Sequence, residues 1–197
     1  MPKNTDVRVG APDQKVTGAI KNAPVGTALP DLTDITKAAV TLNQAFTGDE
    51  YVSEDGLTLS PSRSTTEIKD WSGSTVRKVL ESFDGTLAWT MISTNAGALS
   101  IAFGADHVTT AAATTAHGAQ VKAALGAYLP EAQAWVFLMK DGDARIVIAV
   151  PDGQITEVGE VTFASNAAVG WNVTLSCYPD ANGNSIYIMT DDGVVTA

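Results

Sequence analysis

Apolar and polar residues alternate along much of the chain beyond residue 50. The longest alternating run covers residues 169–178, and its apolar side chains are Val169, Trp171, Val173, Leu175 and Cys177. A period of two is typical of a strand with one buried face. The same pattern predicts further strands in four shorter segments, at residues 87–91, 135–139, 146–150 and 186–188.

Six Asp-Gly or Asn-Gly pairs punctuate this region. They begin at Asp55, Asp84, Asp141, Asp152, Asn182 and Asp192. Such pairs tolerate positive φ at little cost, which favours tight hairpins. Together with the alternation they predict a mainly β fold, an antiparallel sandwich or partial barrel.

Two segments depart from this pattern. Residues 94–104 predict a single short helix, because Thr94 or Asn95 can cap its start, Leu99 and Phe103 share a face, and Gly104 stops it. Residues 105–130 consist largely of Ala, Thr and Gly and predict a long surface loop.

The first 45 residues carry little periodicity and are interrupted by Pro12, Pro24 and Pro30. We interpret them as an irregular N-terminal arm with one or two short extended pieces and nothing to pack against inside an isolated domain. The chain is then expected to be one domain over residues 1–197, with the β domain proper at 46–197.

The net charge of −10 disfavours tight binding to nucleic acid. Residues 141–197 alone contribute −7, and no cluster of Lys and Arg stands out along the sequence. A single cysteine excludes a disulfide framework, and neither a signal peptide nor an apolar run of about 20 residues is present. We therefore expect synthesis in a cytoplasm and no membrane contact.

No catalytic or cofactor-binding set can be assembled from the sequence. His107 and His117 lie in or beside the Ala/Thr-rich segment, with Asp106 as the nearby acid, and we interpret them as solvated loop residues rather than metal ligands or bases. Cys177 lies on the apolar side of an alternating strand, which indicates a small buried hydrophobe rather than a nucleophile. The chain is not expected to be an enzyme.

One pattern is similar to a calcium loop. Asp180, Asn182 and Asn184 stand at alternate positions and Asp191 falls twelfth, but Ser185 occupies the position that needs glycine. A turn at Asn182-Gly183 explains the same residues, so we expect no metal site.

The tryptophans divide into two kinds. Trp89, Trp135 and Trp171 lie in alternating apolar segments and are expected in the core. Trp71 lies among polar residues, where an aromatic side chain is typical of an interface.

Four segments, in this order and spacing, resemble the major tail tube proteins of siphophages, the phages with long non-contractile tails. They are residues 25–31, residues 51–58, residues 68–80 continuing to 90–95 and the Phe103-Gly104 pair, and residues 151–158 followed by 169–178. The resemblance implies a β-sandwich or partial barrel with one flanking helix. Many members of that family carry an additional C-terminal immunoglobulin-like domain, which we expect this chain to lack. It also implies hexameric rings that stack into a tube in the virion tail, assembled in the host bacterial cytoplasm.

The resemblance further implies partners. The chain would contact itself, a tape-measure protein, a tail terminator and tail-tip or distal tail proteins, while genomic DNA would pass through the lumen without specific binding. The residues expected at contacts between subunits are Tyr51, Leu57, Leu59, Trp71 and Val76.

Two alternatives remain open from the sequence. One is another tube-like ring protein, such as a distal tail, baseplate or secretion-tube subunit. The other is a carbohydrate-binding β-sandwich, which should gather exposed aromatics on one face. The four tyrosines are scattered along the chain at Tyr51, Tyr128, Tyr178 and Tyr187, which disfavours the second alternative.

Overall fold

The structure is a computed structural model that describes residues 7–13 and 18–195. Its strands are β1 (Ala11–Pro12), β2 (Ile20–Pro24), β3 (Val52–Lys69), β4 (Thr75–Met91), β5 (Val108–Ala111), β6 (Gln120–Ala123), β7 (Gln133–Asp141), β8 (Ala144–Val158), β9 (Trp171–Tyr178) and β10 (Tyr187–Asp191). The helical elements are α1 (Ala96–Phe103) and two 3-10 turns, η2 (Leu32–Asp34) and η3 (Ala105–His107).

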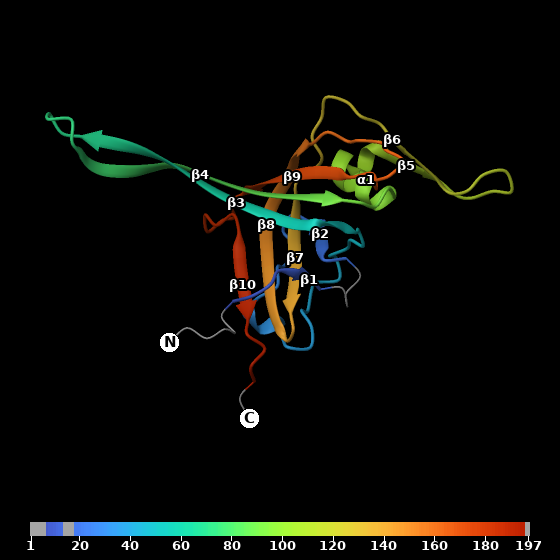
Figure 1. Cartoon of the computed structure of the whole chain (residues 1–197), viewed down its shortest axis with the longest axis horizontal. Coiled ribbons are helices and arrows are strands. Elements are labelled where there is room, and N and C mark those ends of the chain that lie inside the picture. Colours follow the sequence, from blue (N-terminus) through green and yellow to red (C-terminus); the bar gives the residue numbers. More distant parts are fainter. Residues whose placement is uncertain (1–6, 14–17, 196–197) are drawn as a thin grey trace.

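One antiparallel sheet with the strand order β1-β7-β8-β9-β4-β3 makes up most of the molecule. β2 also pairs with β7, and β10 pairs with β8. β8 connects the two layers, because its first half pairs with β7 and β10 and its second half pairs with β9. Figure 1 shows β7, β8 and β10 running across the direction of β3, β4 and β9. The sheet does not close into a barrel, and the predicted mainly β sandwich with one helix is confirmed.

The first core lies between these two layers. Leu87, Trp89 and Met91 of β4 are buried and alternate with half-buried residues, and β9 does the same, as the sequence predicted. The Trp89 ring lies 5.6 Å from that of Trp135 and meets Phe137 edge-on at 5.4 Å. α1 closes one end of this core with apolar side chains such as Ile101. Trp171 is half-buried and meets the Phe103 ring at 5.6 Å.

A second core covers the opposite face of β7 and β8. Residues 134–138 are all buried, because their alternate side chains enter different cores. Ala23, Ile35 and Phe46 cover this second face, so the expectation that the arm has nothing to pack against is wrong for residues 20–46. Residues 1–6 and 14–17 of the arm lie outside the described residues.

The last strand is shifted by one position from its prediction. Ile186 packs against the first core, but Ile188 is 57% exposed and β10 buries Met189 instead. β10 begins at Tyr187, so the alternation does not run through from Ile186.

Several of the predicted turns are absent. Asp141-Gly142 does join β7 to β8, with Gly142 at a φ of 59°. Gly85 and Gly153, however, lie inside β4 and β8, and Gly56 lies at an irregularity within β3. A Cβ on Gly85 would come within 2.6 Å of Ile186 Cδ1, so this glycine is required for space rather than for a turn.

The predicted helix is confirmed as α1, whose first turn is capped by Asn95 accepting from the N–H of Ala98 at 2.8 Å. Gly104 follows the helix with a φ of 86°. The expectation of an unstructured loop over residues 105–130 is partly wrong, because β5 and β6 form a two-stranded hairpin there. β-branched Val108, Thr109 and Thr110 occupy β5, where such residues suit an extended backbone.

Arg145 of β8 fastens the N-terminal segments to the sheet. Its side chain is 1% exposed and pairs with the buried carboxylate of Asp13. It also donates to the carbonyl oxygens of Thr36 at 2.7 Å and Ala38 at 2.8 Å. A buried charge needs such compensation, so this one side chain joins three separate stretches of the chain.

We predict that Arg145→Ala lowers the free energy of unfolding by about 3–5 kcal/mol, because it leaves the Asp13 carboxylate buried without its partner. Urea denaturation followed by tryptophan fluorescence measures this. Lys37→Ala is the matched control, since it removes the exposed ion pair with Asp143 and should leave the urea midpoint nearly unchanged. Equal midpoints for both variants would contradict the role given to Arg145.

Candidate assembly surface

A long hairpin formed by β3 and β4 projects from the body of the molecule. The two strands pair from Leu57↔Trp89 out to Lys69↔Thr75. Every residue from 60 to 84 is exposed, and Figure 1 shows this outer half extending away from the other strands. Isolated two-stranded hairpins are marginally stable in water, so this element is well suited to being covered by another molecule.

Six large apolar side chains on the outer hairpin are exposed to water: Ile68, Trp71, Val76, Val79, Leu80 and Phe83. Single exposed apolar residues are common on protein surfaces, but six on one projecting element form a surface of the kind found at protein contacts.

One face of this hairpin continues the face that covers the first core. Phe83 points the same way as Leu87 and Trp89, because side chains two apart along a strand share a face. The guanidinium of Arg63, the partner of Phe83 across the strands, lies 5.6 Å from the Phe83 ring centroid. The face of β4 that is buried at Leu87 and Trp89 is therefore exposed at Phe83, farther out along the hairpin.

The structure separates the five residues expected at contacts between subunits. Trp71 lies at the hairpin tip and is fully exposed, and Val76 lies nearby and is 67% exposed. Tyr51, 75% exposed, lies at the other end of β3. Leu57 and Leu59 are half-buried against the first core, so each is already partly covered within its own chain.

Sequence reasoning missed Ile68, Val79, Leu80 and Phe83. In the sequence they look like ordinary strand residues, and only the pairing of β3 with β4 shows that no core faces them. Trp71 was identified because it is an aromatic residue in a polar segment.

The outer half of the hairpin, residues 60–84, is rich in charged side chains but carries no net charge. Its four bases, Arg63, Lys69, Arg77 and Lys78, are matched by four acids, Glu67, Asp70, Glu81 and Asp84. The expectation that the chain has no Lys/Arg cluster able to hold several phosphates therefore stays a prediction. Glu67 pairs with Lys78 at 3.0 Å.

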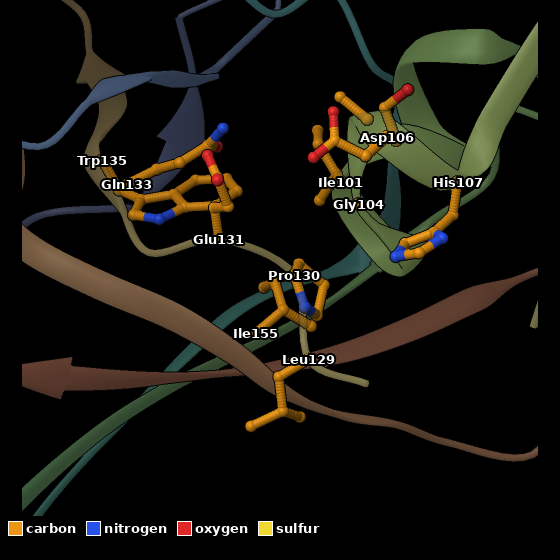
Figure 2. A pocket seen from close by; sticks show the side chains of 12 residues that line it. Ile101, Gly104, Asp106, His107, Leu129, Pro130, Glu131, Gln133, Trp135 and Ile155 are labelled. Carbon is orange, nitrogen blue, oxygen red and sulfur yellow. The ribbon is translucent and has the colours of Figure 1, made fainter. Parts of the chain in front are cut away.

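Two adjoining pockets lie beside α1 and share Leu129, Pro130 and Ile155. Figure 2 shows the first, of about 80 Å³, with the carboxylates of Asp106 and Glu131 at its rim. The second, of about 190 Å³, lies between the end of α1, residues 125–130 and the last residues of β8.

The first pocket does not form a catalytic site. Ser100, Asp106 and His107 all line it, yet no hydrogen bond links these three side chains in the described part of the chain. The His107 ring instead stacks on Tyr128, with 3.5 Å between ring centroids. A nucleophile needs a base within hydrogen-bonding reach, and this arrangement does not supply one. His117 is exposed in the β5–β6 connection, as expected.

Cys177 is buried in the first core, as the sequence predicted. Burial raises the pKa of its thiol to about 12. The reactive thiolate is therefore scarce at neutral pH.

The segment that is similar to a calcium loop is a turn held by Asp180. Its Oδ1 accepts from the N–H groups of Asn182 and Asn184 at 2.8 and 3.0 Å, and its Oδ2 accepts from the Tyr187 hydroxyl at 2.5 Å. The turn at Asn182-Gly183 is present, but β9 and β10 on either side of it do not pair with each other. Residues 7–13 and 18–195 contain no group of three or more side chains able to hold a metal ion.

No helix within the described ranges has the length and apolar character that crossing a membrane requires.

Comparisons with known proteins were made for the whole chain. A family model described as phage tail tube protein matches residues 3–197. Among solved structures, the chain is similar to the anti-feeding prophage cap, a tube-terminating cap, with 12% identity, a TM-score of 0.47 and 94% of each chain covered. No curated protein matches the chain.

We predict that Cys177 reacts with a thiol-specific disulfide reagent at pH 8 only after unfolding, since burial both blocks access and raises its pKa to about 12. The rate of thiol release in native buffer and in concentrated urea measures this. A native rate close to the denatured one would place Cys177 outside the core.

Asp180 should give a pH-dependent contribution to stability. The Tyr187 hydroxyl, followed by the N–H of Asn184, holds the pKa of Asp180 below its ordinary value of 3.8. A carboxyl with a depressed pKa stabilises the fold above its unfolded pKa and loses this contribution as pH falls through its folded pKa.

We therefore expect Asp180→Ala to be less stable than the unmodified chain at pH 7, with the difference shrinking below pH 3.8. Urea midpoints across this pH range test the trend. Tyr187→Phe, which removes one donor, should show the same trend with a smaller difference, and a difference that grows in acid would reverse the assignment.

Proposed function

Because the chain belongs to the phage tail tube protein family, we propose that six copies close into a ring and that these rings stack into the tube of a long, non-contractile tail. The family is structural and not enzymatic, so the chain is a structural protein of the phage tail. The hexameric ring, the tail type and the path of the genome through the tube belong to the proposal.

The observation that carries this proposal is the outer half of the β3–β4 hairpin. It carries six exposed large apolar side chains, and one of them, Phe83, continues the face that covers the first core. A second copy is the simplest partner for a surface that every copy displays.

The edges of the main sheet support association as well. β3 pairs with β4 along one side, and in the described residues no strand pairs with its other side. An edge strand of 18 residues is a ready site for pairing with another chain. Pairing between neighbours would turn the separate sheets into one continuous wall around a lumen and remove these edges.

The charge of the chain suits a conduit for DNA. Residues 141–197 carry −7, and a wall with few basic groups does not hold phosphates by counterion release. We propose that the lumen is acidic or neutral, that a tape-measure protein occupies it during assembly, and that the genome then passes through it without specific binding. Assembly in the host cytoplasm, contact with terminator and tail-tip proteins at the two ends, and a single domain over residues 1–197 complete the proposal.

We expect the purified chain to form rings or tubes when concentrated, visible by negative-stain electron microscopy. Single rings alone would favour a terminator, distal tail or baseplate role instead. Chains that stay monomeric at every concentration, also with a tail-tip complex added as nucleus, would contradict the proposal.

The hairpin surface can be tested within the same assay. Leu80→Asp combined with Phe83→Asp should abolish assembly, because charges replace apolar contacts, while the unfolding temperature stays close to that of the unmodified chain. Leu32→Asp is the matched control, since Leu32 is also exposed but lies in η2, and it should assemble normally.

A further inference from the structure

We propose that Trp71 of one copy inserts into the pocket of about 190 Å³ beside α1 of a neighbouring copy. The proposal rests on the assembly proposed above and names the surface that receives the hairpin tip.

Trp71 projects from an ordered turn at the tip of the hairpin. Its side chain is fully exposed, with 105% of the reference accessible surface. The turn that carries it is fixed by Asp70, whose Oδ1 accepts from the N–H groups of Ser72 and Ser74, both at 2.9 Å, and from the Ser72 hydroxyl at 2.6 Å. An ordered turn has little conformational entropy to lose on binding, and tryptophan is prominent among residues that dominate interfaces.

The receiving pocket has the size and lining that an indole ring requires. Apolar side chains border it, including Phe103, Leu125, Leu129 and Val158. An apolar cavity of about 150 Å³ is enough to hold a benzene ring, so 190 Å³ leaves room for the larger indole. Tyr128 also lines this pocket, and its ring stacks on that of His107 with 3.5 Å between centroids.

Charge is compatible with the same pairing. Residues 60–84 of the outer hairpin carry no net charge, whereas the rest of the chain carries −10. The two adjoining pockets place Asp106, Glu131 and Glu157 around the opening. The neutral hairpin of one copy would therefore be repelled less by this acidic lining than the acidic remainder of the chain would be.

The positions of Trp71 and the pocket in the chain explain why such a contact would repeat from copy to copy. Figure 1 shows the hairpin tip and α1 toward opposite ends of the longest axis, so a chain cannot fill its own pocket. When the hairpin tip of one copy binds the pocket of the next copy, the row of copies still has a free pocket at one end and a free hairpin tip at the other. Repetition then gives a closed ring or a filament, as tube assembly needs.

Cysteine cross-linking tests the contact directly. Chains carrying Trp71→Cys are mixed with chains carrying Leu125→Cys and oxidised at a concentration at which the protein assembles. Leu125 is exposed at the pocket, so a cysteine there is accessible. Cys177 is buried and stays unreactive. We expect disulfide-linked dimers of the two variants. The control pairs Trp71→Cys with Leu32→Cys, and equal yields from the two mixtures would overturn the proposal.

Assembly supplies the second measurement. Trp71→Ala should raise the concentration at which tubes appear by at least ~10-fold, Trp71→Phe by less, and Leu32→Ala by no more than ~2-fold. If Trp71→Ala assembles like the unmodified chain while tubes form normally, the docking is wrong and the proposed function stands. If the unmodified chain does not assemble and the mixture of Trp71→Cys and Leu125→Cys gives no linked dimers, both fail.

Discussion

The complete burial of the β7–β8 pair is the constraint on which the rest of the structure depends. Residues 134–138 send alternate side chains into two different cores, so each face needs its own cover. β4, β9 and α1 cover one face, while the N-terminal segments around Ile35 and Phe46 cover the other. Arg145 is fixed in the same place, because a buried guanidinium on β8 requires the Asp13 carboxylate and the carbonyl oxygens of residues 36–38.

This arrangement divides the molecule into a rigid body and a projecting part. All of the large buried side chains lie in the body, and the outer half of the β3–β4 hairpin contributes none. In the proposed assembly, stability and association therefore depend on different residues. Changes on the hairpin can alter contacts between copies without loss of the fold, whereas changes at β7 or β8 disturb both cores together.

Local signals in the sequence predicted local structure well. The mainly β fold follows from the period-two alternation of apolar residues. The helix α1 and its Asn95 cap follow from side-chain hydrogen bonding over a few residues. Gly85 and Gly153 were misread because their role is to leave space for side chains distant in sequence, such as Ile186 and Trp135. The second core was missed although residues 134–138 form a continuous apolar run, which indicates burial on both faces. Of the candidate surface, Trp71 alone had a local signal, and the rest depended on strand register.

A two-stranded ribbon without a core has unequal mechanical properties in different directions. Extending it along its length would shear the whole hydrogen-bond ladder at once, whereas bending it out of its plane breaks none of these bonds. The irregularities at Ser64/Thr65 and Ile68/Lys69 interrupt the ladder on the outer half and soften it further. In a polymer joined through such ribbons, the joints would bend more easily than the subunits, so the filament could curve while each subunit kept its shape.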